Sequence, residues 1–167
     1  MTRRAVILGA GITGTLTALE LIQRGWEVTV LEARHVGAGS SSRTAAGIRQ
    51  QFSTPSTVIG MRYAVRRYRE LARPFGAPLM TSVGYLFLSH DPDADAARVA
   101  LQHGAGLLEV EHLAPAAAAT RFPWLDPATF RSATFCPSDG FLHPATVYTE
   151  AARCLREAGG TLLARHP

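Results

Sequence analysis

The architecture of this chain is indicated by the segments Val6-Ile7-Leu8, Gly9-Ala10-Gly11-Ile12-Thr13-Gly14 and Val28-Thr29-Val30-Leu31-Glu32. An apolar run precedes three glycines in the spacing G-x-G-x-x-G, and an amphipathic run follows them. Glu32 closes the second apolar run, 18 residues after Gly14. Strand, glycine-rich turn, helix, strand and acid in this order are typical of a dinucleotide-binding βαβ unit.

Each part of this unit has a physical role. Gly9 permits the tight turn, Gly11 lets a pyrophosphate approach the backbone, and Gly14 lets the helix pack closely on the strand. The free N–H groups and the positive end of the helix dipole favour the negative charge of the phosphates. We expect Glu32 to accept hydrogen bonds from the adenosine ribose. The spacing alone does not separate NAD from FAD.

Composition narrows the class of protein. The 167 residues suffice for one ordinary domain with a sizeable core. All 17 basic residues are Arg and are mostly scattered, so the net charge of +4 does not predict a nucleic-acid partner. One cluster is interpreted as the solvated face of a helix: Arg62, Arg66, Arg67, Arg69 and Arg73.

The protein is predicted to be located in the cytoplasm. Cys136 and Cys154 form no C-x-x-C pair and suggest no disulfide framework, which favours a reducing compartment. A secretory signal is disfavoured because Glu20 interrupts the first apolar stretch. We expect no membrane span, because no apolar stretch is long enough. The six His residues lie apart, so no metal site is expected.

Hydrophobic periodicity and capping residues predict the remaining elements. Helices are expected over 12–22, 55–74 and 92–104, from Pro115 for a short length, and over 144–158, where Val147, Ala151, Leu155 and Ala158 face the core. Strands are expected over 6–8, 26–31, 84–89, 107–111, 133–136 and 161–164. Residues 34–54 are predicted to be irregular, and Phe122–Leu125 to be buried.

Beyond Glu32 the sequence resembles a known family. The segments Gly37–Arg43, Ala46–Phe52, Val83–Leu88 and Ser138–Pro144 resemble the D-amino-acid oxidase/sarcosine oxidase type (DAO superfamily) of FAD-dependent oxidoreductase, its N-terminal portion only. The resemblance implies an α/β fold, a Rossmann-like FAD-binding βαβ unit with an inserted, incomplete α+β substrate-domain segment. Residues 1–80 and 143–167 then form an incomplete FAD-binding domain, and residues 81–142 form part of the substrate domain.

The resemblance also implies the residues of the site. The expected cofactor-binding residues are Gly9, Gly11, Ile12, Thr13, Gly14, Glu32, Ala33, Arg34, Ser40, Ser41, Arg43, Thr44, Ala46, Gly47 and Ile48. Thr44 stands where some relatives attach FAD covalently through a His, so noncovalent FAD is expected. Arg49 matches an Arg that faces the substrate, and its planar fork suits a carboxylate. A surface or phosphate-contacting Arg is the alternative. No catalytic residue is assigned, and His143 is interpreted as a capping or packing residue rather than a general base.

The implied activity is FAD-dependent oxidation of the C–N bond of a small amine or amino acid, with hydride transfer to the flavin. Two alternatives stay open at this point: a noncatalytic or partner-dependent FAD- or nucleotide-binding fragment, and an NAD(P)-dependent dehydrogenase. Members of the family are more than twice as long, so the chain is interpreted either as part of a longer protein or as a subunit whose fold a second polypeptide completes.

Overall fold

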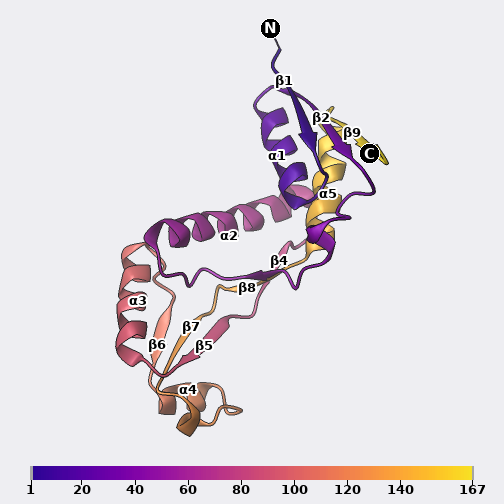
Figure 1. Ribbon diagram of the computed structural model, residues 1–167. Helices are drawn as coiled ribbons and strands as arrows, with labels where there is room; N and C mark the ends of the chain where they lie inside the picture. The colour runs from indigo at the N-terminus through magenta and orange to yellow at the C-terminus, as the bar shows by residue number, and fades with distance from the viewer. Residues whose placement is uncertain (1, 167) are drawn as a thin grey trace. The chain divides into compact units, whose positions relative to one another are not determined.

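The computed structural model describes residues 2–166, which divide into two compact units that are taken one at a time. The first unit contains the chain up to Ala46, residues 69–79, and the chain from Leu142 onward. The second contains residues 47–68 and 80–141. Parallel strands with helices in one unit and antiparallel strands in the other confirm the predicted α/β class (Figure 1).

The first unit is built on a parallel sheet in the order β1-β2-β9. β1 (Arg4–Leu8) is followed by α1 (Ile12–Gln23) and β2 (Glu27–Glu32), which is the predicted βαβ unit. α5 (Pro144–Glu157) packs on α1 and leads into β9 (Thr161–Ala164), which pairs in parallel with β2. Two stretches far apart in the sequence therefore share one sheet.

The sequence explains how the helices of this unit begin and end. Gly25 ends α1 at a φ of +79°, a conformation that glycine adopts without strain. α5 begins at Pro144 and buries Val147, Ala151 and Leu155 as predicted. Ala158, which was expected on the same face, is exposed because the helix has already ended.

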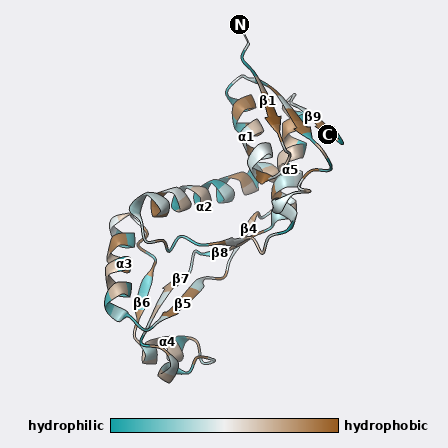
Figure 2. Cartoon of the chain, viewed as in Figure 1, coloured by the Kyte–Doolittle hydropathy of each residue, from teal (hydrophilic) through white to brown (hydrophobic). Residues whose placement is uncertain are grey.

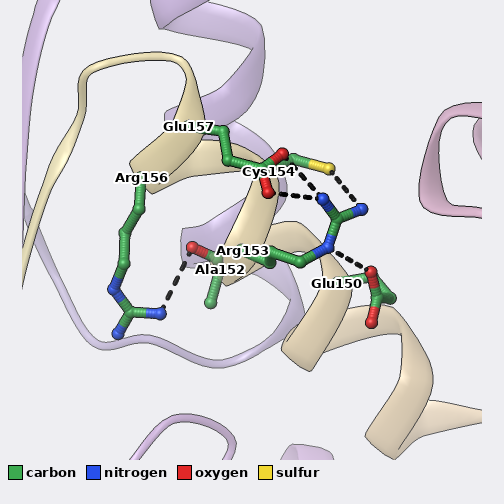
Figure 3. A network of polar contacts seen from close by, with 6 residues as sticks. All are labelled: Glu150, Ala152, Arg153, Cys154, Arg156 and Glu157. Atoms are coloured by element: carbon green, nitrogen blue, oxygen red, sulfur yellow. Dashed lines mark hydrogen bonds and ion pairs between the residues drawn. The ribbon is translucent and has the colours of Figure 1, made fainter.

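The exposed side of α5 carries a network of charged side chains (Figure 3). Arg153 lies between Glu150 and Glu157, with Nε–O and Nη1–O distances of 2.7 and 2.6 Å. Its Nη2 also donates to the Cys154 sulfur at 3.5 Å. Pairs spaced three and four residues apart support an isolated helix by a few tenths of a kcal/mol each, about 0.2–0.5. This network stabilises the helix and is not a site.

α2 (Pro55–Phe75) contributes residues to both units: Tyr68 and the residues before it belong to the second, and Arg69 and those after it to the first. Its apolar face buries Val58 and Val65 almost completely. The short 3-10 helix η1 (Ser40–Ser42) interrupts the segment 34–54, which the sequence predicted to be irregular throughout.

The second unit has an antiparallel sheet in the order β5-β7-β6. Its strands are β5 (Tyr85–Ser89), β7 (Ser132–Cys136) and β6 (Glu111–Leu113). α3 (Pro92–Gly104) packs against β7, with Asp91 accepting the Ala94 N–H at its start as the sequence predicted. α4 (Pro115–Arg121) and the 3-10 helix η2 (Pro127–Thr129) follow β6.

Two predictions for this unit are wrong. The strand expected over 107–111 is a turn, and β6 begins at its last residue. The apolar Leu107 and Val110 of that turn are buried in a cluster with Val58, Val99 and Cys136, so burial there does not reflect a strand. Trp124, expected to be buried, is 74% exposed.

A second small sheet was not predicted at all. β3 (Gly47–Ile48) pairs with β8 (Gly140–Leu142), which neighbours β4 (Met80–Ser82). A Cβ on Gly140 would overlap the Thr81 carbonyl oxygen, so only glycine allows this approach. The sheet joins the segment before Arg49 to the segment after Asp139.

Cys136 and Cys154 are both free, the first buried and the second half-buried. Among residues 2–166, no helix has the length and apolar character that a bilayer crossing requires.

Candidate functional site

The glycine-rich turn between β1 and α1 has the geometry that its sequence predicted. Gly9 lies at a φ of +100°, which an L side chain rarely adopts, and its N–H donates to the Leu31 carbonyl at 2.7 Å. A Cβ on Gly14 would overlap the Gly9 carbonyl oxygen and would lie 3.4 Å from the Ile7 side chain. Gly14 therefore allows α1 to sit directly against the turn.

Ser41 lies beside the start of α1. Its hydroxyl oxygen accepts the Ile12 N–H at 3.0 Å, and a Cβ on Gly11 would come within 2.9 Å of the same oxygen. Gly11 is the N-cap of α1 and provides no side-chain cap. The positive helix end thus has a serine oxygen next to it and no carboxylate in its first turn, an arrangement that suits an added anion.

Glu32 is oriented by two backbone groups. Its Oε2 accepts the Ala10 N–H at 2.8 Å, and its Oε1 accepts the Arg34 N–H at 2.9 Å. These bonds, the Ala10 bond first, hold the pKa of the Glu32 carboxyl below its usual value against a small opposing effect of burial. A carboxylate oxygen has two lone pairs, so each oxygen can still accept a ribose hydroxyl.

The loop after β2 is held by its own side chains. Arg34 Nη2 donates to the Ala38 carbonyl at 2.9 Å, and the Gly37 N–H donates to the Ala10 carbonyl at 2.9 Å. A Cβ on Gly37 would overlap the Tyr148 ring. The loop is therefore fixed against the glycine-rich turn on one side and α5 on the other.

Thr44 and Ala46 form a second constrained point in the first unit. The Thr44 hydroxyl accepts the Ala46 N–H at 2.9 Å, and the Ala46 carbonyl accepts the Leu142 N–H at 2.9 Å. Ala46 has a φ of +55°, a strained value for a residue with a side chain. Strain of this kind persists where surrounding contacts impose it, and it is common at ligand sites.

These features fit the ADP half of FAD. The turn brings Gly9, Gly11 and Gly14 to one helix end, and Ser41 and Glu32 border the same turn. The remaining predicted residues of the first unit lie around the turn or along the loop that follows β2: Ile12, Thr13, Ala33, Arg34, Ser40, Arg43, Thr44 and Ala46. Of these, Ser40 begins η1 and Arg43 follows its last residue with an exposed side chain.

Gly47, Ile48 and Arg49 belong to the second unit, and the first two form β3. Gly47 has no room for a side chain, because a Cβ would overlap the Tyr85 hydroxyl oxygen. Arg49 follows β3, and its guanidinium carbon lies 4.6 Å from the Phe52 ring centroid and 5.7 Å from that of Phe87. The guanidinium is thus placed by two aromatic rings.

Arg49 lines a pocket of about 390 Å³ within the second unit. Phe52, Phe87 and Leu88 supply apolar walls, while Gln51 and Ser89 add polar groups. Arg98 brings a second guanidinium, which is paired with the buried Asp95. Most of the residues that line this pocket are polar, and the Arg49 guanidinium among them favours an anionic group.

The sequence assigned no role to a buried hydrogen-bonded cluster that includes Gln51 of the pocket lining. The Asp139 carboxylate is fully buried and accepts hydrogen bonds from Gln50 and Gln51. The Gln50 side chain also donates to the Ser138 hydroxyl at 2.9 Å. The segment 138–144 was singled out for its resemblance, but its register with residues 50–51 depends on β3 pairing with β8.

His143 occupies the N-cap position of α5, and its side chain does not cap the helix. Its N–H donates to the Leu79 carbonyl at 2.9 Å, which is a structural role for its backbone. The described part of the chain contains no group of three His, Cys, Asp or Glu residues placed to hold a metal ion.

Comparison with known proteins identifies relatives. A family model described as FAD dependent oxidoreductase (DAO) matches residues 4–167. The chain is 30% identical over 170 aligned residues to the tRNA 5-methylaminomethyl-2-thiouridine biosynthesis bifunctional protein MnmC of Paraburkholderia phytofirmans, covering 98% of this chain and 25% of that protein. It is 35% identical to the protein of the same name from Legionella pneumophila (strain Corby) over 60% of this chain and 16% of that one.

Solved structures of the same fold are also found. The L-proline dehydrogenase of P. horikoshii superposes with a TM-score of 0.86 at 32% identity, over 98% of this chain and 44% of that one. Glycine oxidase from Geobacillus kaustophilus gives a TM-score of 0.77 at 24% identity, over 98% of this chain and 47% of that one, which shows the fold alone. The chain spans a quarter or less of the curated relatives above and less than half of either solved chain.

Proposed function

The chain belongs to the FAD-dependent oxidoreductase family, and we propose that it takes part in oxidising the C–N bond of a small amine or amino acid that carries a carboxylate. The observation that carries this proposal is the Arg49 guanidinium, stacked on Phe52 and Phe87 in a pocket of small-molecule size. The family match favours FAD over NAD(P) as the dinucleotide.

The proposed roles follow from the chemistry of each group. Glu32 binds the adenosine ribose, and the N–H groups at the start of α1, with Ser41, hold the pyrophosphate. Gly47 and Ile48 border the flavin ring. Bound FAD supplies the two-electron acceptor for the hydride that leaves the α-carbon. Arg49 binds the substrate carboxylate through two parallel N–H···O bonds and so orients the α-carbon.

We propose that residues 1–80 and 143–167 form the FAD-binding part, in which Arg49 alone is assigned to the substrate, and that residues 81–142 form part of the substrate domain. FAD is proposed to bind noncovalently at this end of the chain, because the Thr44 side chain offers a hydroxyl where a covalent linkage uses a ring nitrogen. The Thr44 oxygen is also engaged by the Ala46 N–H. If FAD is bound noncovalently, denaturing and precipitating the FAD-loaded protein releases all of the flavin into the supernatant.

Anaerobic reduction of the flavin tests the activity. The purified chain, reconstituted with FAD, is mixed with sarcosine, glycine or L-proline, and the loss of visible absorbance is followed. Bleaching by one of these amines is the expected result. Bound flavin that no amine bleaches would favour a noncatalytic or partner-dependent FAD-binding module instead.

Substitution of Arg49 by Lys tests its role. Lys keeps the charge but loses the bidentate fork, so substrate affinity should fall by about tenfold or more while the flavin spectrum stays unchanged. A matched control is Arg131→Lys, an exposed Arg in the same unit that does not line the pocket. Unchanged substrate kinetics in Arg49→Lys would remove Arg49 from the site.

An amine carried on tRNA is a second candidate substrate, although the charge distribution alone predicted no nucleic-acid partner. Relatives at 30% and 35% identity are named for biosynthesis of a methylaminomethyl-thiouridine in tRNA. Exposed arginines on α2, among them Arg62 and Arg73, offer positive charge. Binding of tRNA that is competed by salt, and bleaching by tRNA bearing an alkylaminomethyl uridine, would support this candidate; bleaching by free amino acids alone would count against it.

A further inference from the structure

Asp139 is a buried carboxylate whose hydrogen-bond donors are neutral. Its side chain is 0% exposed at the turn between β7 and β8. Oδ1 accepts the Gln50 backbone N–H at 2.8 Å and the Gln50 Nε2 at 3.2 Å, and Oδ2 accepts the Gln51 Nε2 at 3.1 Å. These three donors come from the two residues that directly follow Arg49, and the Cys136 side chain is a further hydrogen-bond partner of Asp139.

The two glutamines have further partners that fix their orientation. Gln50 Nε2 also donates to the Ser138 hydroxyl at 2.9 Å, and Gln51 Nε2 donates to the Tyr85 carbonyl at 3.0 Å. Each amide nitrogen has two hydrogens, and both are used, so the amides cannot turn over without losing bonds. Residues 50 and 51 are therefore clamped to the turn at 138–139.

Phe52, the residue after Gln51, is held by a hydrogen bond from α3. The Phe52 carbonyl accepts Gln102 Nε2 at 2.9 Å, from the buried face of α3. Phe52 supplies one of the two rings on which the Arg49 guanidinium lies. The backbone on the C-terminal side of Arg49 and the ring beneath its side chain are thus both anchored to the interior of the second unit.

Burying the Asp139 carboxylate costs desolvation free energy. Burial raises the pKa of Asp139, although the bonds from Gln51 and Gln50 oppose the shift. An apolar residue would avoid the cost of desolvation, but it would leave three buried donors without an acceptor. Three neutral donors converge on this carboxylate and fix the geometry of the network, in which the Gln51 Oε1 atom is buried without a hydrogen-bond partner.

We propose that Asp139 is the positioning residue for Arg49: through Gln50 and Gln51 it holds the Arg49 guanidinium between Phe52 and Phe87 in the pocket. The inference rests on the proposed function only in that Arg49 there binds the substrate carboxylate. Asp139 is hydrogen-bonded to Gln51, which lines the pocket, but Asp139 is not itself among the lining residues.

A spectroscopic test does not depend on substrate. Ring currents of Phe52 and Phe87 shift the Arg49 Nε–H resonance, which is identified by its loss in Arg49→Lys. In Asp139→Asn the new NH₂ group faces donors, so the 49–52 segment moves and the Arg49 resonance returns toward the position of a solvated Arg. Arg121, whose guanidinium carbon lies 4.3 Å from the Phe135 centroid in the same unit, is the internal control and should keep its shift.

Two further variants separate positioning from folding. Asp126→Asn makes the same chemical change at the cap of η2 and should leave the Arg49 resonance in place. Gln51→Met removes one donor without burying a new polar group and should move the Arg49 resonance in the same direction by less. An unmoved Arg49 resonance in Asp139→Asn, or equal movement of Arg49 and Arg121, overturns the proposal.

Binding supplies a second readout. In Asp139→Asn the affinity for L-proline should fall about tenfold or more, while that for pyrrolidine, which lacks the carboxylate, stays within twofold. In an Arg49→Lys background, Asp139→Asn should have no further effect on L-proline, because coupled residues are not additive. Equal losses for both ligands, or additive losses, overturn the proposal. If no amine binds the wild-type chain, the proposed function fails, and the Arg49 resonance still decides the positioning role.

Discussion

At the scale of single residues, Glu32 shows how a binding carboxylate is prepared before its ligand arrives. Two backbone N–H groups, those of Ala10 and Arg34, keep it ionised and aimed across the glycine-rich turn. An acid in this position was predicted from spacing alone. Its backbone partners were not, because they depend on the way the loop after β2 folds back on the turn.

Substituting Glu32 by Gln should weaken FAD binding by about tenfold to a hundredfold. Hydrogen bonds that involve a charged group contribute about 1.5–3 kcal/mol, roughly twice those between neutral groups. The Gln amide also presents an NH₂ group to one of two backbone donors. Titration of the apoprotein with FAD, followed by flavin fluorescence, measures the change.

Glu27→Gln is the matched control for that substitution. Glu27 begins the same strand and pairs with Arg4 on the surface, with a side chain that is 56% exposed. Its replacement should leave FAD affinity within twofold. A similar loss in both variants would mean that the effect comes from the strand and not from the ribose contact.

Asp139 gives a pH dependence whose sign can be worked out. Its pKa in the folded protein is raised above the ordinary value of 3.8, so the folded state binds the proton more tightly than the unfolded state. Its contribution to stability is complete below pH 3.8 and is lost as pH rises through the raised pKa. At most, one such proton changes the free energy of unfolding by about 1.4 kcal/mol per pH unit.

Urea unfolding at a series of pH values measures this contribution. The free energy of unfolding of the wild type minus that of Asp139→Asn should decrease from pH 3.8 upward and then level off. Taking the difference removes the opposite effect of Glu32, whose lowered pKa makes its contribution decline as pH falls. A difference that grows with pH would show that the folded-state pKa of Asp139 is not raised.

At the scale of elements, the sequence predicts those parts whose signals are local. α1, α3 and α5 follow from apolar periodicity together with Gly25, Asp91 and Pro144. β3, β4 and β8 have only two or three residues each, so they carry no period and exist through pairing with distant partners. The position of β6 was predicted wrongly for a related reason, because the buried apolar residues of a turn resemble those of a buried strand.

Packing of α1 on the glycine-rich turn gives a prediction at this scale. In Gly14→Ala the new methyl group overlaps the Gly9 carbonyl, so the helix must shift at a cost of about 1–3 kcal/mol. FAD affinity should fall with it, because the helix start moves away from the pyrophosphate. Chemical unfolding and FAD titration of the same preparation measure the two effects.

Gly60→Ala is the control, since Gly60 lies inside α2 with nothing within 4 Å of an added Cβ. Alanine there should stabilise the chain by about 0.5–1 kcal/mol. If Gly14→Ala proved as harmless as Gly60→Ala, the close approach of helix and turn would not be a requirement of the fold.

At the scale of the whole molecule, the sequence predicts the glycine-rich turn of the first unit more fully than the Arg49 pocket of the second unit. The residues proposed to bind adenosine lie mostly in one continuous segment, from Gly9 to Glu32. The pocket around Arg49 takes its walls from segments near residues 52, 88, 98 and 134. Such an assembly depends on long-range pairing, which is why Asp139 and Arg98 gave no recognisable signal.

The apolar surface of β1 supports a last prediction. Val6 and Leu8 are 66% and 80% exposed, on a strand at the edge of the β1-β2-β9 sheet, and β1 is strongly apolar in Figure 2. Exposed apolar edge strands favour pairing with other chains. We therefore expect the 167-residue chain to self-associate reversibly in sedimentation velocity experiments.

The double variant Val6→Thr and Leu8→Thr should raise the dissociation constant of that association about tenfold or more, because each side chain loses apolar area that the contact would bury. Thr is β-branched, a shape that strands favour, so the sheet itself should persist. Leu108→Thr changes a residue that is 74% exposed in a turn of the second unit, and it should leave association unchanged. If the double variant and Leu108→Thr changed the dissociation constant equally, the association would be nonspecific hydrophobic contact. That result would exclude the β1 edge as the specific interface.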